Sequence, residues 1–134
     1  MSSEVFGRWT LRCVLRLVEV DGENDEGFIV RYEELDRLPK SEGIYVVKKD
    51  DQIIYCGKFT TGFTKRWLYA KDRYIYHVKR HGLARALQNR HKVLVFSEDL
   101  SALLLQHPNC GLDLKGIERD LYDLYHPEWN KTRP

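Results

Sequence analysis

Short apolar runs separated by polar breaks set the pattern of the middle of the chain. The runs 44–47 and 53–55 flank the polar segment 48–52. Two apolar runs joined by a short polar turn predict a β-hairpin. Three further segments rich in valine, leucine or phenylalanine predict strands: residues 11–20, 28–32 and 92–96. We expect the first two to pair across the acidic turn 21–27, and the third to lie beside the central hairpin.

Three segments carry features typical of helices. Thr64 is a candidate N-cap for a helix over residues 65–72. Roughly helical spacing of apolar residues predicts a second helix over residues 74–89, weakened in its middle by Gly82. The most regular pattern lies at residues 113–125 and predicts a helix with one core-facing face. Its apolar stripe consists of Leu114, Ile117, Leu121, Leu124 and Tyr125.

Glu118 falls inside this stripe, four residues after Leu114 and three before Leu121. A carboxylate on a buried face is costly unless it is paired, protonated or bound to a cation. One interpretation is a glutamate at the edge of the stripe, paired with an arginine. The other, favoured by the chemistry of the central hairpin, is a metal-binding acid.

These elements predict an α+β fold with a central three-stranded, mostly antiparallel sheet flanked by helices, plus an N-terminal strand pair. The length of 134 residues suits a single domain with one core. Within it we expect an N-terminal extension over residues 1–38, a core over residues 39–130 and a tail over residues 131–134.

Charge is concentrated in one segment. The whole chain carries only +2, but residues 58–92 hold ten lysines and arginines against one acid, or +9, which leaves −7 for the rest. Six aromatic residues lie in the same segment. A basic block interleaved with aromatics is typical of a nucleic-acid surface, although a solvated helical face would also be basic. The candidate contact residues are Lys65, Arg66, Lys71, Arg73, Lys79 and Arg80.

Several classes of protein are disfavoured. Apolar runs are only a few residues long, so no membrane span is predicted. The first residues lack the basic start and apolar core of a signal peptide, and we expect a soluble cytoplasmic protein. The cysteines, at positions 13, 56 and 110, form no C-x-x-C pair, so neither a disulfide framework nor a zinc finger is indicated.

The central hairpin resembles a known family. Its triplets Gly43-Ile44-Tyr45 and Tyr55-Cys56-Gly57 are similar to the two name-giving triplets of the GIY-YIG nucleases, with Cys56 in place of an aliphatic residue. The ending of the last helix is similar too, because Glu118 is followed by His-Pro-Glu-Trp-Asn at residues 126–130. The resemblance covers about residues 39–130 and is greatest to the small phage endonucleases and type II restriction enzymes.

The resemblance implies a metal-dependent DNA endonuclease. A single Mg²⁺ or Mn²⁺ on Glu118 would polarise the phosphate and steady the leaving oxygen. Arg66 would clamp two phosphate oxygens, and Lys58 would add a point charge. Tyr45 is the first choice for the general base, with its pKa lowered by nearby cations. Supporting roles fall to Tyr55, through a hydrogen bond, and to Asn130, which would hold the geometry around Glu118.

One position departs from the family pattern. Many members carry a tyrosine or histidine one helical turn after the arginine, but the residue four past Arg66 is an alanine. Tyr69, three past Arg66, could take its place. Alternatively, Arg73 and His77 are themselves four apart, and His77 could then be the base.

Two other functions compete with the nuclease. The first is a nucleic-acid-binding protein on the same fold without catalysis, in which Glu118 serves only packing or an ion pair. The second is a protein–protein module, such as an inhibitor of a nucleic-acid enzyme, that uses the acidic N-terminal part. For the nuclease the expected partner is double-stranded DNA. Cutting both strands needs two active sites or two encounters, which is consistent with a homodimer or higher homo-oligomer.

Overall fold

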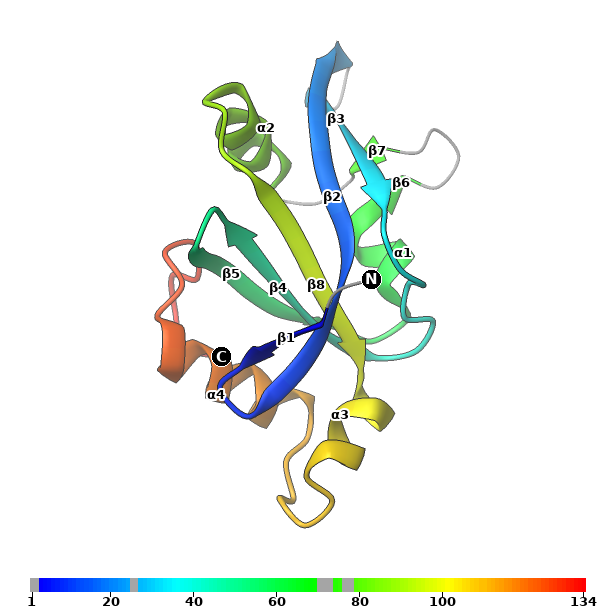
Figure 1. The fold of residues 1–134 in the computed structure, drawn as a ribbon, viewed down its shortest axis with the longest axis vertical. Helices are drawn as coiled ribbons and strands as arrows, with labels where there is room; N and C mark the ends of the chain where they lie inside the picture. Colours follow the sequence, from blue (N-terminus) through cyan, green and yellow to red (C-terminus); the bar gives the residue numbers. More distant parts are fainter. Residues whose placement is uncertain (1–2, 25–26, 70–73, 76–78) are drawn as a thin grey trace.

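The computed structural model describes residues 3–24, 27–69, 74–75 and 79–134, with side chains omitted at 21–24, 27–28, 69, 74 and 80 (Figure 1). The elements follow in the order β1 (Ser3–Phe6), β2 (Trp9–Asn24), β3 (Gly27–Glu34), β4 (Gly43–Lys49), β5 (Gln52–Phe59), α1 (Phe63–Trp67), β6 (Leu68–Tyr69), β7 (Tyr74–Ile75), α2 (Arg80–Gln88), β8 (Val93–Asp99), α3 (Leu100–Gln106) and α4 (Leu114–Tyr125). The fold is α+β, as predicted.

One antiparallel sheet contains all the strands in the described part of the chain, in the order β5-β4-β8-β2-β3-β7-β6, with β1 paired to β2. The sheet is larger than the predicted three central strands, because the predicted N-terminal strand pair belongs to it. β2 and β3 do pair, but β2 also hydrogen-bonds to β8. A strand of 16 residues is long enough to serve both neighbours, so the N-terminal hairpin continues the sheet.

The central hairpin is confirmed, with β4 and β5 joined by a turn at Asp50 and Asp51. Asp50 has a φ of 53°, in the left-handed region that aspartate tolerates better than most residues. The register sets Tyr45 opposite Gly57 and Val46 opposite Cys56. β8 lies on the other side of β4, where the sequence predicted it.

β4 is enclosed on both faces of the sheet. Its first five residues are buried, and the four after Gly43 alternate between two hydrophobic clusters. Tyr45 and Val47 face the cluster covered by α1 and α2, whereas Ile44 and Val46 face the cluster covered by α3 and α4. The sheet therefore has helices on both faces (Figure 1).

Two helix predictions need correction. α1 begins and ends earlier than the predicted helix 65–72, because Gly62 rather than Thr64 precedes it and Leu68 is already extended (φ −120°, ψ 142°). The rings of Phe63 and Trp67 stack at 5.8 Å and bury the short helix in the core.

The predicted helix 74–89 begins only at Arg80, because Tyr74 and Ile75 pair with neighbouring strands. Hydrogen bonding at the sheet edge overrides helical spacing here.

The C-terminal half follows the sequence closely. α4 begins at Leu114, where the Asp113 side chain caps it by accepting from the Gly116 amide, and it ends at His126 in the left-handed conformation. Leu114, Ile117 and Leu121 are buried as the stripe predicts, but Leu124 is 53% exposed, so the prediction is wrong for the last turn of the helix. Within the described residues no helix is long and apolar enough to cross a membrane.

A buried ionic cluster joins β2, β8 and the segment before β4. Arg12 on β2 makes two hydrogen bonds to the Glu98 carboxylate (2.9 and 3.1 Å) and lies 3.4 Å from Asp36. The three side chains are only 8–11% exposed. Removing one partner of such a cluster leaves charges buried without compensation, which costs far more than an exposed pair contributes.

We expect Arg12→Met to lower the free energy of unfolding by about 3–5 kcal/mol, because two buried carboxylates lose their cation. Urea denaturation monitored by circular dichroism measures the loss. Arg16→Met is the matched control, since Arg16 lies on the same strand and its pair with Glu33 is 45–50% exposed. Its expected loss is much smaller, because exposed ion pairs contribute little to stability. Equal losses in the two variants would contradict the buried cluster.

Candidate active site

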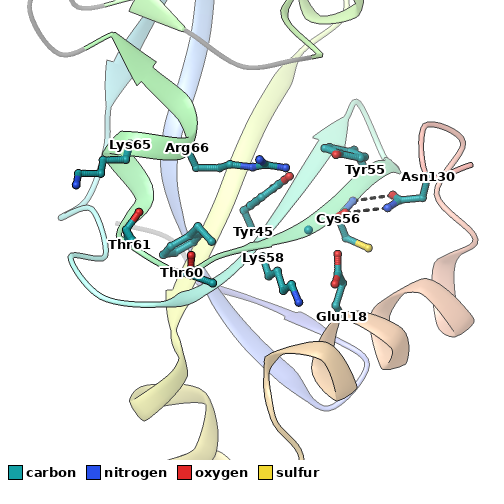
Figure 2. Close-up of a pocket in the computed structure, with 12 residues that line it drawn as sticks. Tyr45, Tyr55, Cys56, Lys58, Thr60, Thr61, Lys65, Arg66, Glu118 and Asn130 are labelled. Atoms are coloured by element: carbon teal, nitrogen blue, oxygen red, sulfur yellow. Dashed lines mark hydrogen bonds between the residues drawn. The ribbon is translucent and has the colours of Figure 1, made fainter. Parts of the chain in front are cut away.

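A polar cavity of about 500 Å³ lies beside β5, which is an edge strand of the sheet (Figure 2). Six of the eight candidate catalytic residues line it: Tyr45, Tyr55, Lys58, Arg66, Glu118 and Asn130. They come from β4, β5, α1, α4 and the segment after α4. Five regions spread over 86 positions of the chain therefore converge on one cavity.

The structure describes the positions of some of the other candidate residues and not of others. Arg66 lines the cavity, whereas Arg73, Lys71 and His77 lie outside the described part of the chain. The backbone of Tyr69 pairs with Tyr74 on β7, and no side chain is described there or at Arg80. Two further nucleic-acid candidates have described positions. Lys65 lines the cavity, and the Lys79 amine lies 5.3 Å from the ring centre of Tyr55.

β5 divides the cavity into two chemically different sides. Successive residues of a strand point to opposite faces of the sheet. Tyr55 therefore lies with Tyr45 and Arg66 on one side, and Lys58 lies with Glu118 on the other, as Figure 2 shows. Phenols and a guanidinium line the first side, and an ammonium and a carboxylate line the second.

Tyr45 is fully buried, and its ring lies 5.7 Å from that of Tyr55 and 5.0 Å from that of Trp67. Burial raises the pKa of Tyr45 far above its ordinary value, and Tyr55 adds to the rise. The charge and hydrogen bond of Arg66 oppose the shift without cancelling it. The expected lowering of the pKa by cations is therefore wrong for Tyr45, because desolvation of the phenolate outweighs the attraction of one guanidinium.

Gly57 makes room for this tyrosine. A Cβ at position 57 would overlap the Tyr45 hydroxyl and ring. Because Tyr45 and Gly57 are cross-strand partners, the missing side chain lets the phenol lie across β5 and reach the cavity. The glycine of the second triplet, Gly57, is thus needed because any side chain there would overlap Tyr45.

Glu118 is half-buried on α4. Desolvation raises the pKa of its carboxyl, while the positive charges of Lys58, Arg66 and Lys115 act in the opposite direction. Cys56 is buried on the same side of β5, and burial followed by the charge of Glu118 raises the pKa of its thiol to about 12. At neutral pH Cys56 is therefore a neutral thiol and not a nucleophile.

Asn130 closes the outer edge of β5. Its Oδ1 accepts from the Cys56 amide (2.9 Å), and its Nδ2 donates to the Cys56 carbonyl (2.9 Å), as the dashed lines in Figure 2 show. The Trp129 amide donates to the Ile54 carbonyl (2.9 Å), two residues before Cys56 on the same edge. The segment after α4 thus satisfies an otherwise free strand edge and fixes β5 relative to Glu118.

A divalent cation fits the donor chemistry of the Glu118 side. No group of three acidic, histidine or cysteine side chains gathers anywhere in the described residues, so no all-protein metal cage is present there. Mg²⁺ does not need one, because it commonly binds through one or two carboxylates and completes its shell with water and substrate phosphate oxygens. Glu118, half-buried and facing a polar cavity, is the residue that would hold it.

Comparisons with known proteins add no precedent: no family model, no curated protein and no solved structure matches this chain. The interpretation of the site therefore depends on its side chains and their surroundings.

The sequence missed several residues at the site. Thr60 and Thr61 line the cavity, and Lys115 and Lys131 lie beside it. Lys115 precedes Glu118 by three residues, a spacing that puts two side chains on the same face of a helix, so periodicity could have found it. Lys131 had no such signal beyond its position next to Asn130.

We expect Asn130→Ala to lower the free energy of unfolding by about 1–3 kcal/mol, because it leaves a backbone donor and acceptor of β5 without partners. Hydrogen exchange at the Cys56 amide, measured by NMR, should become faster than in the wild type. Asn109→Ala is the control, since Asn109 is exposed. Unchanged exchange at Cys56 would contradict the proposed role of the Asn130 side chain.

Proposed function

We propose that this protein is a metal-dependent endonuclease of the GIY-YIG type that hydrolyses phosphodiester bonds in double-stranded DNA. The observation that carries the proposal is the convergence of six residues from five separate regions on one polar cavity. Pure binding of a polyanion would not need a half-buried carboxylate among those cations, because a negative charge there weakens the attraction.

The arrangement of strands also supports the proposal. The hairpin β4-β5 and the neighbouring β8 form an antiparallel unit with β4 in its centre. This unit carries both triplets and is followed by the helix that bears Glu118. We propose that it corresponds to the three-stranded core of the family and that the N-terminal strands are an addition to it.

The positively charged groups of the cavity act on the phosphate. Arg66 donates two hydrogen bonds to phosphoryl oxygens, and Lys58 adds a point charge. Glu118 would hold Mg²⁺ or Mn²⁺, which would supply a Lewis acid to stabilise negative charge on the leaving oxygen. Fixed charges that face a developing negative charge are usually the largest contribution to such a reaction.

The two tyrosines take different roles from those that the resemblance alone suggests. Tyr45 is buried and keeps its proton, so it positions Arg66 and Tyr55. Tyr55 is only partly buried and lines the cavity. We assign the orientation of the attacking water to the Tyr55 hydroxyl, and the hydrogen bond between the two phenols supports it.

The test is conversion of supercoiled plasmid to nicked and linear forms, with Mg²⁺, Mn²⁺ or EDTA. We expect metal-dependent cleavage that Glu118→Gln reduces by about 100-fold or more, because the metal loses its protein ligand. Glu128→Gln is the matched control, since Glu128 is exposed and does not line the cavity. Thermal unfolding at pH 8 should find Glu118→Gln at least as stable as the wild type, because the raised pKa of Glu118 means that its ionised form destabilises the fold.

The other outcomes point to the competing functions. A gel shift without cleavage in any metal, unchanged in Glu118→Gln, would indicate a non-catalytic nucleic-acid-binding protein. Absence of salt-sensitive DNA binding would favour a protein–protein module. Cleavage at the full rate in Glu118→Gln would exclude Glu118 as the metal ligand.

We also predict a pH dependence set by Glu118. The metal binds the carboxylate, so cleavage is lost as the pH falls through the raised pKa of Glu118. The Lys58 charge lowers this pKa, and Lys58→Met should therefore move the acidic limb of the rate profile to higher pH, whatever it does to the maximal rate. Lys65→Met is the control, because Lys65 lines the cavity and is not among the groups that shift Glu118. A limb that stays in place in Lys58→Met would contradict the assignment.

A further inference from the structure

A second hollow, of about 380 Å³, adjoins the active-site cavity. The two share four lining residues: Tyr55, Lys58, Glu118 and Asn130. A substrate bound at Glu118 can therefore extend from one hollow into the other without leaving the surface. The proposed chemistry uses only the first hollow, so the second has no assigned role.

Lysines dominate the second hollow. Besides Lys58 it is lined by Lys79 before α2, Lys115 on α4 and Lys131 after α4. The acidic side chain among its lining residues is Glu118. Three lysines from separate segments facing one hollow repel one another, and an anion bound there relieves the repulsion.

The walls of the hollow are built from well-packed residues. The Trp129 ring packs against Gly82 so closely that a Cβ on the glycine would lie 2.9 Å from it, and the Trp129 amide is bonded to β5. Lys79 lies over the ring of Tyr55. Pro134 also lines the hollow, and its oxygen accepts a hydrogen bond from Arg119 (2.5 Å). The lysines thus stand around a fixed surface.

A third hollow, of about 580 Å³, lies on the opposite side of the active-site cavity and shares Thr61 and Lys65 with it. Its lining combines the apolar residues Leu38 and Pro39 with three cations and one acid, namely Arg37, Lys40, Lys65 and Glu34, so it is more apolar than the lysine hollow but also basic. The lysine hollow and the third hollow, on either side of the active-site cavity, therefore differ in chemistry. Lysine binds phosphate as a point charge. The lysine hollow has four lysines against one acid and less apolar lining, so it is the end that better matches a sugar-phosphate backbone.

We propose that the lysine hollow binds the phosphates of the cleaved strand immediately to one side of the scissile bond, through Lys79, Lys115 and Lys131. This inference rests on the proposed function for the identity of the strand. It makes the enzyme dependent on at least one neighbouring phosphate, so DNA is a much better substrate than an isolated phosphodiester.

The test measures the affinity for a fluorescent random duplex of about 20 base pairs in EDTA, at salt concentrations from about 0.05 to 0.2 M. Each phosphate contact contributes about 0.9 to the slope of log affinity against log salt. We expect the triple variant Lys79→Ala, Lys115→Ala, Lys131→Ala to lose about two to three from this slope. The matched control is Lys49→Ala, Arg85→Ala, Lys92→Ala, which removes the same charge from residues that line none of the three hollows. An equal change of slope in the two triple variants, or no change in the first, would overturn the inference.

Cleavage assays separate this inference from the proposed function. The lysine-hollow variant should lose at least about tenfold more rate on plasmid than on bis(p-nitrophenyl) phosphate, which has no neighbouring phosphate, because the loss of Lys115 near Glu118 affects both substrates alike. If the wild type cuts DNA and the variant binds with an unchanged slope, the inference fails and the nuclease stands. If the slope falls but no metal supports cleavage, the phosphate site stands and the nuclease fails. Competition by polyglutamate as effective per charge as DNA would overturn the assignment to a nucleic-acid strand.

Discussion

The burial of β4 on both faces and both edges is the constraint on which the site depends. β4 is hydrogen-bonded to β5 and β8, and its side chains fill two separate hydrophobic clusters. A one-residue slip of register would exchange the two clusters and carry Tyr45 to the opposite face. The core therefore fixes the position of Tyr45, and Tyr45 with the gap at Gly57 fixes the polar side of the cavity.

The edge strand β5 has to reconcile two requirements. Its outer backbone groups need partners, yet the same edge must remain open to a large anionic substrate. Asn130 and Trp129 satisfy Cys56 and Ile54, and the strand beyond them faces the cavity. A half-buried carboxylate then lies among lysines and an arginine, which oppose the desolvation that raises its pKa. The same cations suit a phosphate, so the charges that oppose the rise of the Glu118 pKa are those proposed to bind the substrate.

Sequence patterns predicted the elements that bury apolar residues at regular spacing. The central hairpin, the strand beside it and the last helix lie where the pattern indicated. The failures lie between Phe63 and Gln88, where a short helix, two two-residue strands and a late helix replace two long helices. In that segment pairing at the sheet edge and stacking of Phe63 on Trp67 decide the conformation, and neither is visible as periodicity. The predicted number of strands in the sheet was too low for a related reason. The long strand β2 places the N-terminal hairpin in the same sheet as the central hairpin.

The sequence by itself determined the chemical inventory: two tyrosines, a lysine, an arginine, a glutamate and an asparagine at spacings that suggested one site. It also determined that Glu118 would lie on a mostly apolar face, because helical periodicity is local. Only the tertiary structure decided that these groups share a cavity, that Tyr45 is buried with a raised pKa, and that Lys79, Lys115 and Lys131 surround a second hollow. The physical reason is that pKa values and cavities depend on desolvation and on charges brought close by long-range packing, which a linear pattern does not contain.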